Sequence, residues 1–77
     1  MTKQTYTIVL EPQTGGGFTV VVPALPEIVT EGETEAEAID MAAEAIALAL
    51  EHRRENGLEI PAGSASQVRQ VTVEAAA

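Results

Sequence analysis

Cysteine and tryptophan are absent from this sequence, whose aromatic residues are one tyrosine and one phenylalanine. No disulfide and no cysteine-bound metal can therefore hold the fold together. The 77 residues make one small domain, 1–77, whose own core would give only marginal stability. We expect the missing stability to come from close packing or from a second copy of the chain, so we predict a homodimer or a higher homo-oligomer.

Basic side chains are also scarce, with 4 Lys and Arg against 12 Asp and Glu and a net charge of −8. Such a charge repels a phosphate backbone, so direct nucleic-acid binding is not expected. It suits a basic protein partner, or serves solubility alone. The apolar runs fall far short of the roughly 18 residues that suggest a membrane span, and residues 1–4 form no apolar targeting segment. We therefore expect a cytoplasmic protein without membrane contact.

Alternation with a period of two predicts strands at 5–10 and 18–22, and a shorter one at 28–31. The first two would form an antiparallel hairpin around a Gly-rich turn at 13–17. A phosphate-binding loop is not expected there, because a strand rather than a helix follows the turn. Val9 and Val21 would point away from the buried face. The side chains expected on the buried face are Tyr6, Ile8, Leu10, Phe18, Val20 and Val22.

A long helix is predicted at 35–56, where helix-forming residues dominate. Thr34 is expected as its N-cap: the hydroxyl would accept a hydrogen bond from the Glu37 amide, and the Glu37 carboxylate would return to the Thr34 amide. Gly57 would supply the left-handed residue after the helix. The cations that suit the negative helix end are His52, Arg53 and Arg54.

Apolar residues form a broad arc on this helix. The stripe expected to face the sheet is Ile39, Ala42, Ala43, Ile46 and Leu50. A second stripe, expected to meet another subunit or partner, is Met41, Ala45, Leu48 and Ala49. With a last strand predicted at 68–73, the fold class is α+β in the order β-β-β-α-β, a small antiparallel-rich sheet with one helix on one face. One helix leaves a sheet face and strand edges uncovered, which again favours dimerisation.

Groups able to perform catalysis are few. His52 is the one histidine, and we interpret it as a polar residue facing the helix dipole. Ser64 and Ser66 lie in a predicted loop without a nearby base, so no activated nucleophile is expected. We predict no enzymatic activity, no cofactor and no metal.

A group of acidic residues leads from the third predicted strand into the helix. It could hold Mg²⁺ for phosphoryl chemistry, which would make the protein a metal-dependent nuclease. So short a chain, however, has little material for the walls of a metal cleft. We therefore interpret the group as a docking surface for a basic protein, or as a solvated face. Its members are Glu31, Glu33, Glu35, Glu37, Asp40 and Glu44. All of them except Glu35 are expected at the docking surface.

Several short motifs, taken in this order, resemble the N-terminal domain of HicB-family antitoxins from prokaryotic HicA–HicB toxin–antitoxin systems. They are the strand at 6–10, the Gly-rich turn before Phe18, Pro23-Ala24-Leu25-Pro26, Gly32-Glu33-Thr34 with Glu37-Ala38, Ala42-Ala43-Glu44-Ala45, and Pro61 before Val71-Thr72-Val73. The resemblance implies a truncated ribonuclease-H-like fold that neutralises a small basic RNA-cleaving toxin, HicA-like, by covering its active site. It also implies that the protein itself is not a nuclease.

The sequence departs from this family pattern at two points. Members commonly carry a C-terminal DNA-binding segment, which we do not expect here because the chain stops at Ala77, just after the last predicted strand. After Pro26 the family often has Gly followed by a small residue or Cys, where this chain has Glu27 and Ile28. An orphan homo-oligomer without a toxin partner is the alternative to an antitoxin.

Overall fold

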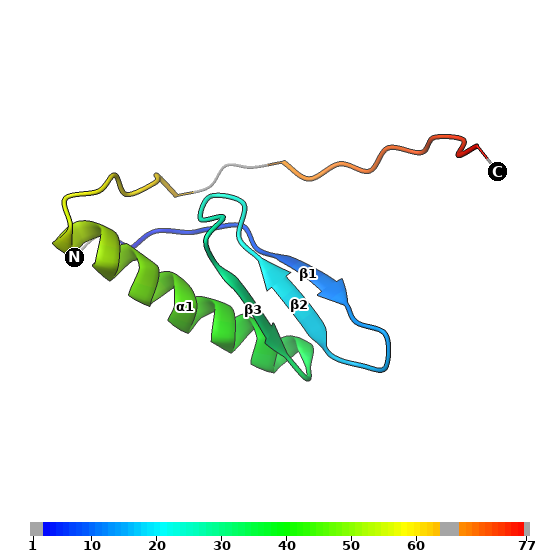
Figure 1. The fold of residues 1–77 in the computed structure, drawn as a ribbon, viewed down its shortest axis with the longest axis horizontal. Helices are drawn as coiled ribbons and strands as arrows, with labels where there is room; N and C mark the ends of the chain where they lie inside the picture. Colours follow the sequence, from blue (N-terminus) through cyan, green and yellow to red (C-terminus); the bar gives the residue numbers. More distant parts are fainter. Residues whose placement is uncertain (1–2, 64–66, 77) are drawn as a thin grey trace.

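The computed structural model describes residues 3–63 and 67–76. An antiparallel meander in the order β1-β2-β3 is followed by one long helix that lies across one of its faces (Figure 1). The elements are β1 (Val9–Pro12), β2 (Phe18–Val21), β3 (Val29–Gly32) and α1 (Glu35–Glu55). The α+β class is thus confirmed. Within the described residues no helix combines the length and the apolar character that crossing a membrane requires.

β1 begins later than predicted, at Val9, because its partner residue Val21 is the last of β2. Beyond β2 the chain turns twice: the Leu25 N–H donates to the Val22 carbonyl at 2.9 Å, and the Ile28 N–H donates to the Leu25 carbonyl at 3.0 Å. These turns carry the chain out of the ladder and into β3. Residues 5–8 therefore precede the sheet instead of forming part of it.

The Gly-rich turn predicted at 13–17 does join β1 to β2. The Gln13 N–H donates to the Gly17 carbonyl at 2.9 Å, and the Gly16 N–H donates to the Gln13 carbonyl at 3.1 Å. The φ angles of Gly15, Gly16 and Gly17 are 90°, 111° and 85°. Three successive residues in this region favour glycine, because a side chain would clash with its own backbone there.

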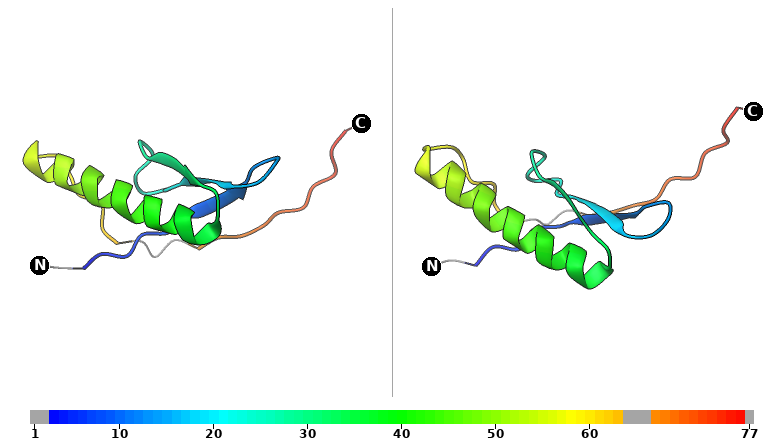
Figure 2. Two further views of the ribbon diagram at one scale, coloured as in Figure 1. Left: turned by 90° about the horizontal axis from the view of Figure 1, so that it is seen from below. Right: turned by 60° about the horizontal axis from the view of Figure 1, so that its bottom comes forward.

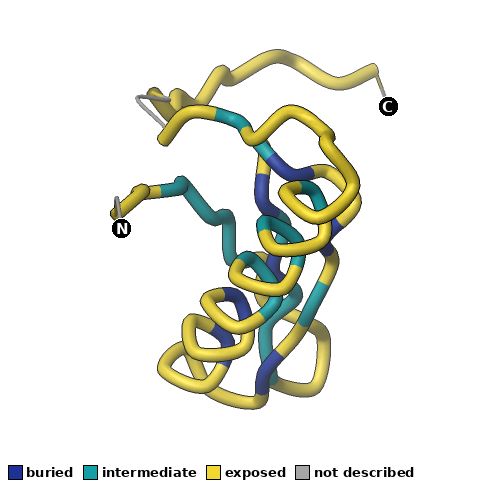
Figure 3. The backbone as a smooth tube through the Cα atoms, turned by 90° about the vertical axis from the view of Figure 1, so that its left-hand side faces the viewer, coloured by how far each residue is buried: buried dark blue, intermediate teal, exposed yellow. Residues whose placement is uncertain are grey.

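The core between sheet and helix has two parts. The proximal cluster, near the start of α1, is formed by buried Val20, Ala38 and Ala42, against which Ile8, Leu10 and Phe18 pack. The distal cluster, toward the end of α1, is formed by buried Val22, Leu25 and Ile28 with Tyr6, Ile8, Ala45, Ile46, Ala49 and Leu50. Figure 3 shows the buried positions on the facing sides of helix and strands. The six side chains predicted for the buried face of the strands all belong to these clusters.

Gly32, the last residue of β3, lets the chain pass directly into the helix. A Cβ atom placed there would lie 2.5 Å from the Ala38 nitrogen and 2.7 Å from the Ala38 Cα. Both are backbone atoms, which cannot move aside as a flexible side chain would. The helix and the sheet meet closely at this point and open toward the other end of the helix (Figure 2).

The helix face that meets the sheet is rotated from the predicted stripe. Its most buried residues are Ala38 and Ala42. Ile39 and Ala43, predicted to face the sheet, are exposed, Ile39 by 44%. The prediction is wrong at these two positions because β3 approaches so closely that alanine occupies the centre of the face, which leaves the larger Ile39 at its flank.

The second predicted stripe divides between the core and the surface. Ala45 and Ala49 pack in the distal cluster, so they are not available to a partner. Met41 and Leu48 are exposed by 40% and 61%, as the prediction of a second apolar surface requires. Periodicity alone does not separate the two pairs, since both lie within one broad apolar arc.

The end of α1 confirms the predicted cap. Gly57 has φ 66°, its N–H donates to the Arg54 carbonyl at 3.3 Å, and the Leu58 N–H donates to the Arg53 carbonyl at 2.8 Å. This pair of bonds is the Schellman arrangement that reverses a chain after a helix. The reversed chain then passes the N-terminal segment, where the Tyr6 hydroxyl donates to the Pro61 carbonyl at 2.6 Å.

The last predicted strand, at 68–73, is not part of this sheet. The segment 67–76 is extended and exposed, and in the described part of the chain it pairs with none of the strands. Figure 1 shows it running away from the body of the molecule toward the C-terminus. The observed order is therefore β-β-β-α followed by an extended segment, because alternation predicts the conformation of a strand but not which edge pairs with it.

Candidate protein-docking surface

The start of α1 places the first acidic residues of the predicted group. Thr34 is the N-cap, with φ −124° and ψ 164°, and its Oγ1 accepts a hydrogen bond from the Glu37 N–H at 3.1 Å. The Glu37 carboxylate accepts from the Glu33 N–H at 3.2 Å, one residue earlier than the Thr34 amide that we predicted. The predicted hydrogen bond to the Thr34 hydroxyl is thus confirmed, whereas the Glu37 carboxylate binds the amide of Glu33 and not that of Thr34. Glu33 and Glu37 are fixed side by side as a result.

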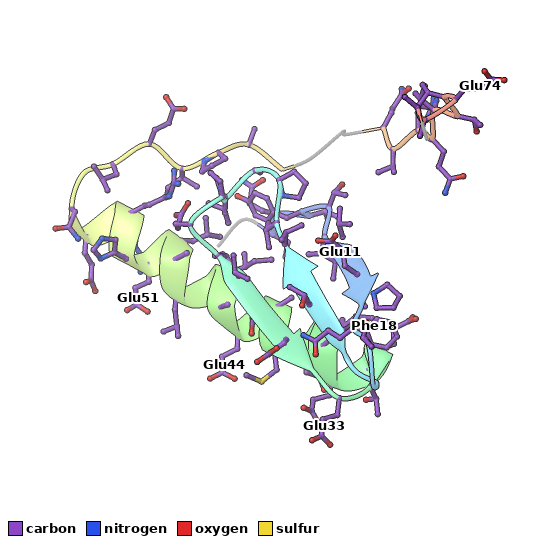
Figure 4. All side chains as sticks on the ribbon, turned by 45° about the vertical axis from the view of Figure 1, so that its right-hand side comes forward. Glu11, Phe18, Glu33, Glu44, Glu51 and Glu74 are labelled. Atoms are coloured by element: carbon purple, nitrogen blue, oxygen red, sulfur yellow. The ribbon has the colours of Figure 1, made fainter. Side chains whose placement is uncertain are left out.

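Beyond the cap, exposed carboxylates follow one edge of the helix. Steps of three, four and seven residues place Glu37, Asp40, Glu44 and Glu51 on the same side. In the view of Figure 4, the labelled Glu33, Glu44 and Glu51 follow one line along the molecule. Two exposed apolar residues, Met41 and Leu48, lie four positions after Glu37 and Glu44, so they adjoin this line. We call these six helix residues the acidic helix edge.

Glu31 does not share the acidic helix edge. In β3 it alternates with Thr30, which pairs with buried Val20 on the core side, so Glu31 projects from the opposite face of the sheet. There the Gln13 side-chain amide donates to the Glu31 carboxylate at 2.8 Å and to the Thr19 hydroxyl at 2.7 Å. The structure therefore brings four of the five predicted residues to the helix start and edge, and places Glu31 elsewhere.

The sheet face opposite the helix also carries a row of valines. Val21 pairs with Val9 on one side and with Val29 on the other, so the three lie abreast across the strands. Val29 is exposed by 68%. Val9 and Val21 lie on this face as predicted; Val29 was not predicted there, although the alternation of the third strand could have assigned it. This open face is half apolar and half acidic, with Glu11 and Glu31 beside the valines.

At the end of the helix, Arg53 has a role that the sequence did not reveal. Its guanidinium binds the Glu27 carboxylate through Nε at 3.0 Å and through NH2 at 2.8 Å, and its NH1 donates to the Glu59 carbonyl at 3.0 Å. The Glu27 pKa is lowered, first by a hydrogen bond from its own backbone N–H and then by Arg53. Arg53 thus joins the β2–β3 connection to the chain that follows the helix. Twenty-six residues separate the pair, so no local pattern could have indicated it.

Of the histidine and serine residues considered for catalysis, His52 lies in the described part of the chain. Asn56 lies beside His52, with its Nδ2 3.3 Å from the ring Nδ1 and donating to the His52 carbonyl at 2.8 Å. Ser64 and Ser66 lie outside the described residues. Among the described residues, the carboxylates and His52 form no group of three that could hold a metal ion. What the described surfaces offer is a contact area of negative charge with apolar residues beside it, which is chemistry for binding.

These observations describe a small α+β domain with two candidate binding surfaces, the acidic helix edge and the open sheet face, an arrangement that suits a class of antitoxin domains. A family model described as "HicB_like antitoxin of bacterial toxin-antitoxin system" matches residues 6–76. The chain therefore belongs to the HicB-like antitoxin family.

Two curated proteins are similar to this chain. Antitoxin HicB 1 of Photorhabdus laumondii is 41% identical over 56 residues, which are 73% of this chain and 36% of that protein. UPF0150 protein Ta0767 of Thermoplasma acidophilum is 33% identical over 63 residues, which are 82% of this chain and 91% of that protein. The alignment thus covers about a third of the Photorhabdus antitoxin and most of the Thermoplasma protein.

Proposed function

We propose that this protein is a non-catalytic, cytoplasmic antitoxin that neutralises a small basic HicA-like RNA-cleaving toxin by covering its active site, and that it acts as a homo-oligomer. The family match over residues 6–76 is the observation that carries the proposal. The charge of −8 supports it, because a basic RNA-cleaving enzyme and an acidic partner attract one another. No cofactor, metal or direct nucleic-acid contact enters this function.

The acidic helix edge is the proposed docking surface. Its carboxylates are exposed and fixed on a rigid helix, so they meet a basic partner without prior rearrangement. Charge of this kind mainly speeds and orients the encounter. Met41 and Leu48 add apolar contact area inside the same edge, and desolvation of such residues contributes more of the affinity.

Charge reversal on the helix tests this docking surface. A small basic protein encoded beside this chain would be purified, and its binding and RNA cleavage measured with and without the antitoxin. Asp40→Lys with Glu44→Lys should slow association by at least about tenfold at low salt, with a smaller difference at high salt. Glu59→Lys with Glu74→Lys changes the net charge equally but lies outside the helix, and should slow association far less. Equal effects of the two pairs would reject the helix edge as the docking surface.

Further variants separate the sheet face from the helix edge. Glu31→Lys places a cation on the open sheet face and should leave binding within about threefold if the helix edge is the contact. Met41→Ala with Leu48→Ala should speed dissociation with little effect on association. If the adjacent basic protein does not bind, or retains full RNA cleavage in the complex, the antitoxin function is rejected. RNA cleavage by the pure chain with Mg²⁺ or Mn²⁺, abolished by changing one carboxylate, would reject the non-catalytic function.

A further inference from the structure

The segment that follows the helix carries apolar side chains that the described part of the chain leaves uncovered. Val68, Val71 and Val73 are exposed by 67%, 83% and 77%, although β-branched residues in an extended backbone suit a half-buried strand. Val71 and Val73 are two positions apart and so face the same side, with Gln70 and Thr72 on the other. This is the residue pattern of an edge strand, although the segment pairs with no strand in the described part of the chain.

The sheet has a strand edge without a strand in the described part of the chain. β1 pairs with β2 on one side, and no described strand pairs with its other side. The helix lies over β3 and β2, so the core side of β1 is less covered. Ile8 and Leu10, on that side, remain half-buried, and a further strand beside β1 would complete their burial.

The course of the chain favours the β1 edge over the β3 edge. After the helix, Pro61 and Gly63 run beside the segment that leads into β1: the Tyr6 hydroxyl donates to the Pro61 carbonyl, and the Gly63 N–H donates to the Gln4 side-chain oxygen at 2.8 Å. The other edge belongs to β3, which passes into α1 within two residues of Gly32. The C-terminal segment thus starts out on the β1 side of the sheet.

We propose that residues 68–73 of one chain pair with the β1 edge of a second copy, and that the second copy returns the same contact, which gives a strand-exchanged homodimer. The segment stands clear of its own sheet even though Gly63 is held beside Gln4 (Figure 1). Two reciprocal contacts close the assembly and leave no further edge of this kind for chain after chain to add. Charge agrees, since Arg69 is the one charged residue of 68–73 and β1 carries Glu11.

This inference rests on the proposed self-association and is independent of any toxin. It also accounts for stability, because a chain of 77 residues has little core of its own. The donated strand would add main-chain hydrogen bonds and cover Val71 and Val73 together with the half-buried side of β1. Each copy would then complete the sheet of the other.

Disulfide trapping tests the exchange in the full chain, which has no native cysteine. Glu11→Cys is introduced into a tagged chain, and Thr72→Cys or Gln70→Cys into an untagged one, since all three positions face the open side in the proposed pairing. Under mild oxidation the mixture should form a disulfide between tagged and untagged chains. A Glu51→Cys chain in place of Glu11→Cys is the control and should give only background cross-linking.

The same reagents define the outcomes against the proposal. A disulfide that closes within single chains of a Glu11→Cys, Thr72→Cys double variant, without cross-linking between chains, means that the segment docks on its own sheet and overturns the exchange. A dimer in sedimentation that gives no such cross-link overturns the exchange but leaves self-association standing. A monomer at all concentrations overturns both. Toxin binding is measured separately, so its failure does not affect this result.

A second pair of variants addresses the valines themselves. Val71→Asp with Val73→Asp places charge on the side proposed to face the core and should raise the dimer dissociation constant by at least about tenfold. Gln70→Asp with Thr72→Asp adds the same charge to the opposite side and should change it much less. Circular dichroism must show that α1 persists in both pairs. An unchanged dimer in the valine pair overturns the proposal.

Discussion

The two parts of the core hold the helix on the sheet in different ways. In the proximal cluster the contact is close because the residues are small: Gly32 has no side chain, and Ala38 and Ala42 present only methyl groups. In the distal cluster the separation is wider, and larger side chains from the β2–β3 connection fill it. The buried members there are Val22, Leu25 and Ile28.

The same helix is thus held at its start by residues with little or no side chain, which permit close approach, and toward its end by the volume of large side chains. The proximal cluster should tolerate no added atom, because the neighbouring atoms are backbone. The distal cluster should suffer most from deletion, because removed atoms leave a void. Arg53 adds a polar contact only at the distal end, where it binds Glu27. Four substitutions compare the two ends, in order of decreasing expected loss of stability.

Gly32→Ala is the most severe test of the proximal end. The new Cβ would lie 2.5 Å from the Ala38 nitrogen, so the turn or the helix must shift. We expect a loss of at least about 3 kcal/mol in the free energy of unfolding, measured by urea titration with circular dichroism. Gly57→Ala is the control: φ 66° strains the new residue, but the site is open, and the loss should be about 1 kcal/mol. Equal losses would mean that close approach is not what requires Gly32.

Leu25→Ala tests the distal end by deletion. Leu25 is fully buried, and its removal should cost about 2–3 kcal/mol, at the lower end for leucine because a small domain can partly collapse into the space. Leu58→Ala, at a residue exposed by 53%, should cost less than about 1 kcal/mol in the same titration. If Leu25→Ala leaves the free energy of unfolding unchanged, side-chain volume is not what stabilises the distal cluster.

Thr34→Ala removes the cap where the proximal end begins. The Glu37 N–H would lose its partner at 3.1 Å, with an expected loss of about 1 kcal/mol. Thr34→Ser keeps the hydroxyl and should restore nearly all of it. The measurement is thermal unfolding of both variants beside the parent. If Ser is no better than Ala, the hydroxyl contributes nothing at this cap.

Glu27→Gln weakens the ion pair at the distal end and should have the smallest effect. The pKa of Glu27 is lowered in the folded protein, so its stabilising contribution is present above the ordinary value of 4.5 and is lost as the pH falls through the folded pKa. Parent and variant should therefore differ slightly in unfolding midpoint at pH 7 and converge in acid. Arg53→Lys, which keeps the charge without the two-pronged geometry, should fall between them at pH 7. A difference that grows on acidification would contradict this sign.

Local chemistry allowed much of the fold to be predicted. Thr34, Gly57 and the Gly-rich turn are short-range features, and the helix bounds and hairpin follow from them. The predicted helix stripe is wrong at Ile39, because alanine is equally suited to a closely packed core and to the surface. The close approach of Gly32 is what puts the alanines, and not Ile39, against the sheet. The proposed docking surface was inferred from composition and stays a prediction.

Relations between distant residues could not be predicted in this way. Arg53 and Glu27 are brought together by folding alone, and both residue types are common on solvated surfaces. Glu31 is near the helix carboxylates in sequence and was predicted to lie with them. Successive residues of a strand face opposite sides, however, so Glu31 lies on the other face of the sheet. The segment 68–73 has the residue pattern of a strand, but its own sequence does not indicate which strand edge would pair with it.

The bond between the Tyr6 hydroxyl and the Pro61 carbonyl has a practical consequence. Because the chain contains one tyrosine and no tryptophan, fluorescence excited beyond the phenylalanine absorption band arises from Tyr6 alone. That ring packs against the distal cluster at the point where the beginning of the chain meets the segment leading to its end. The molecule therefore contains its own optical probe at this junction, and titrating the concentration of unlabelled protein can report whether the chain ends rearrange when copies meet.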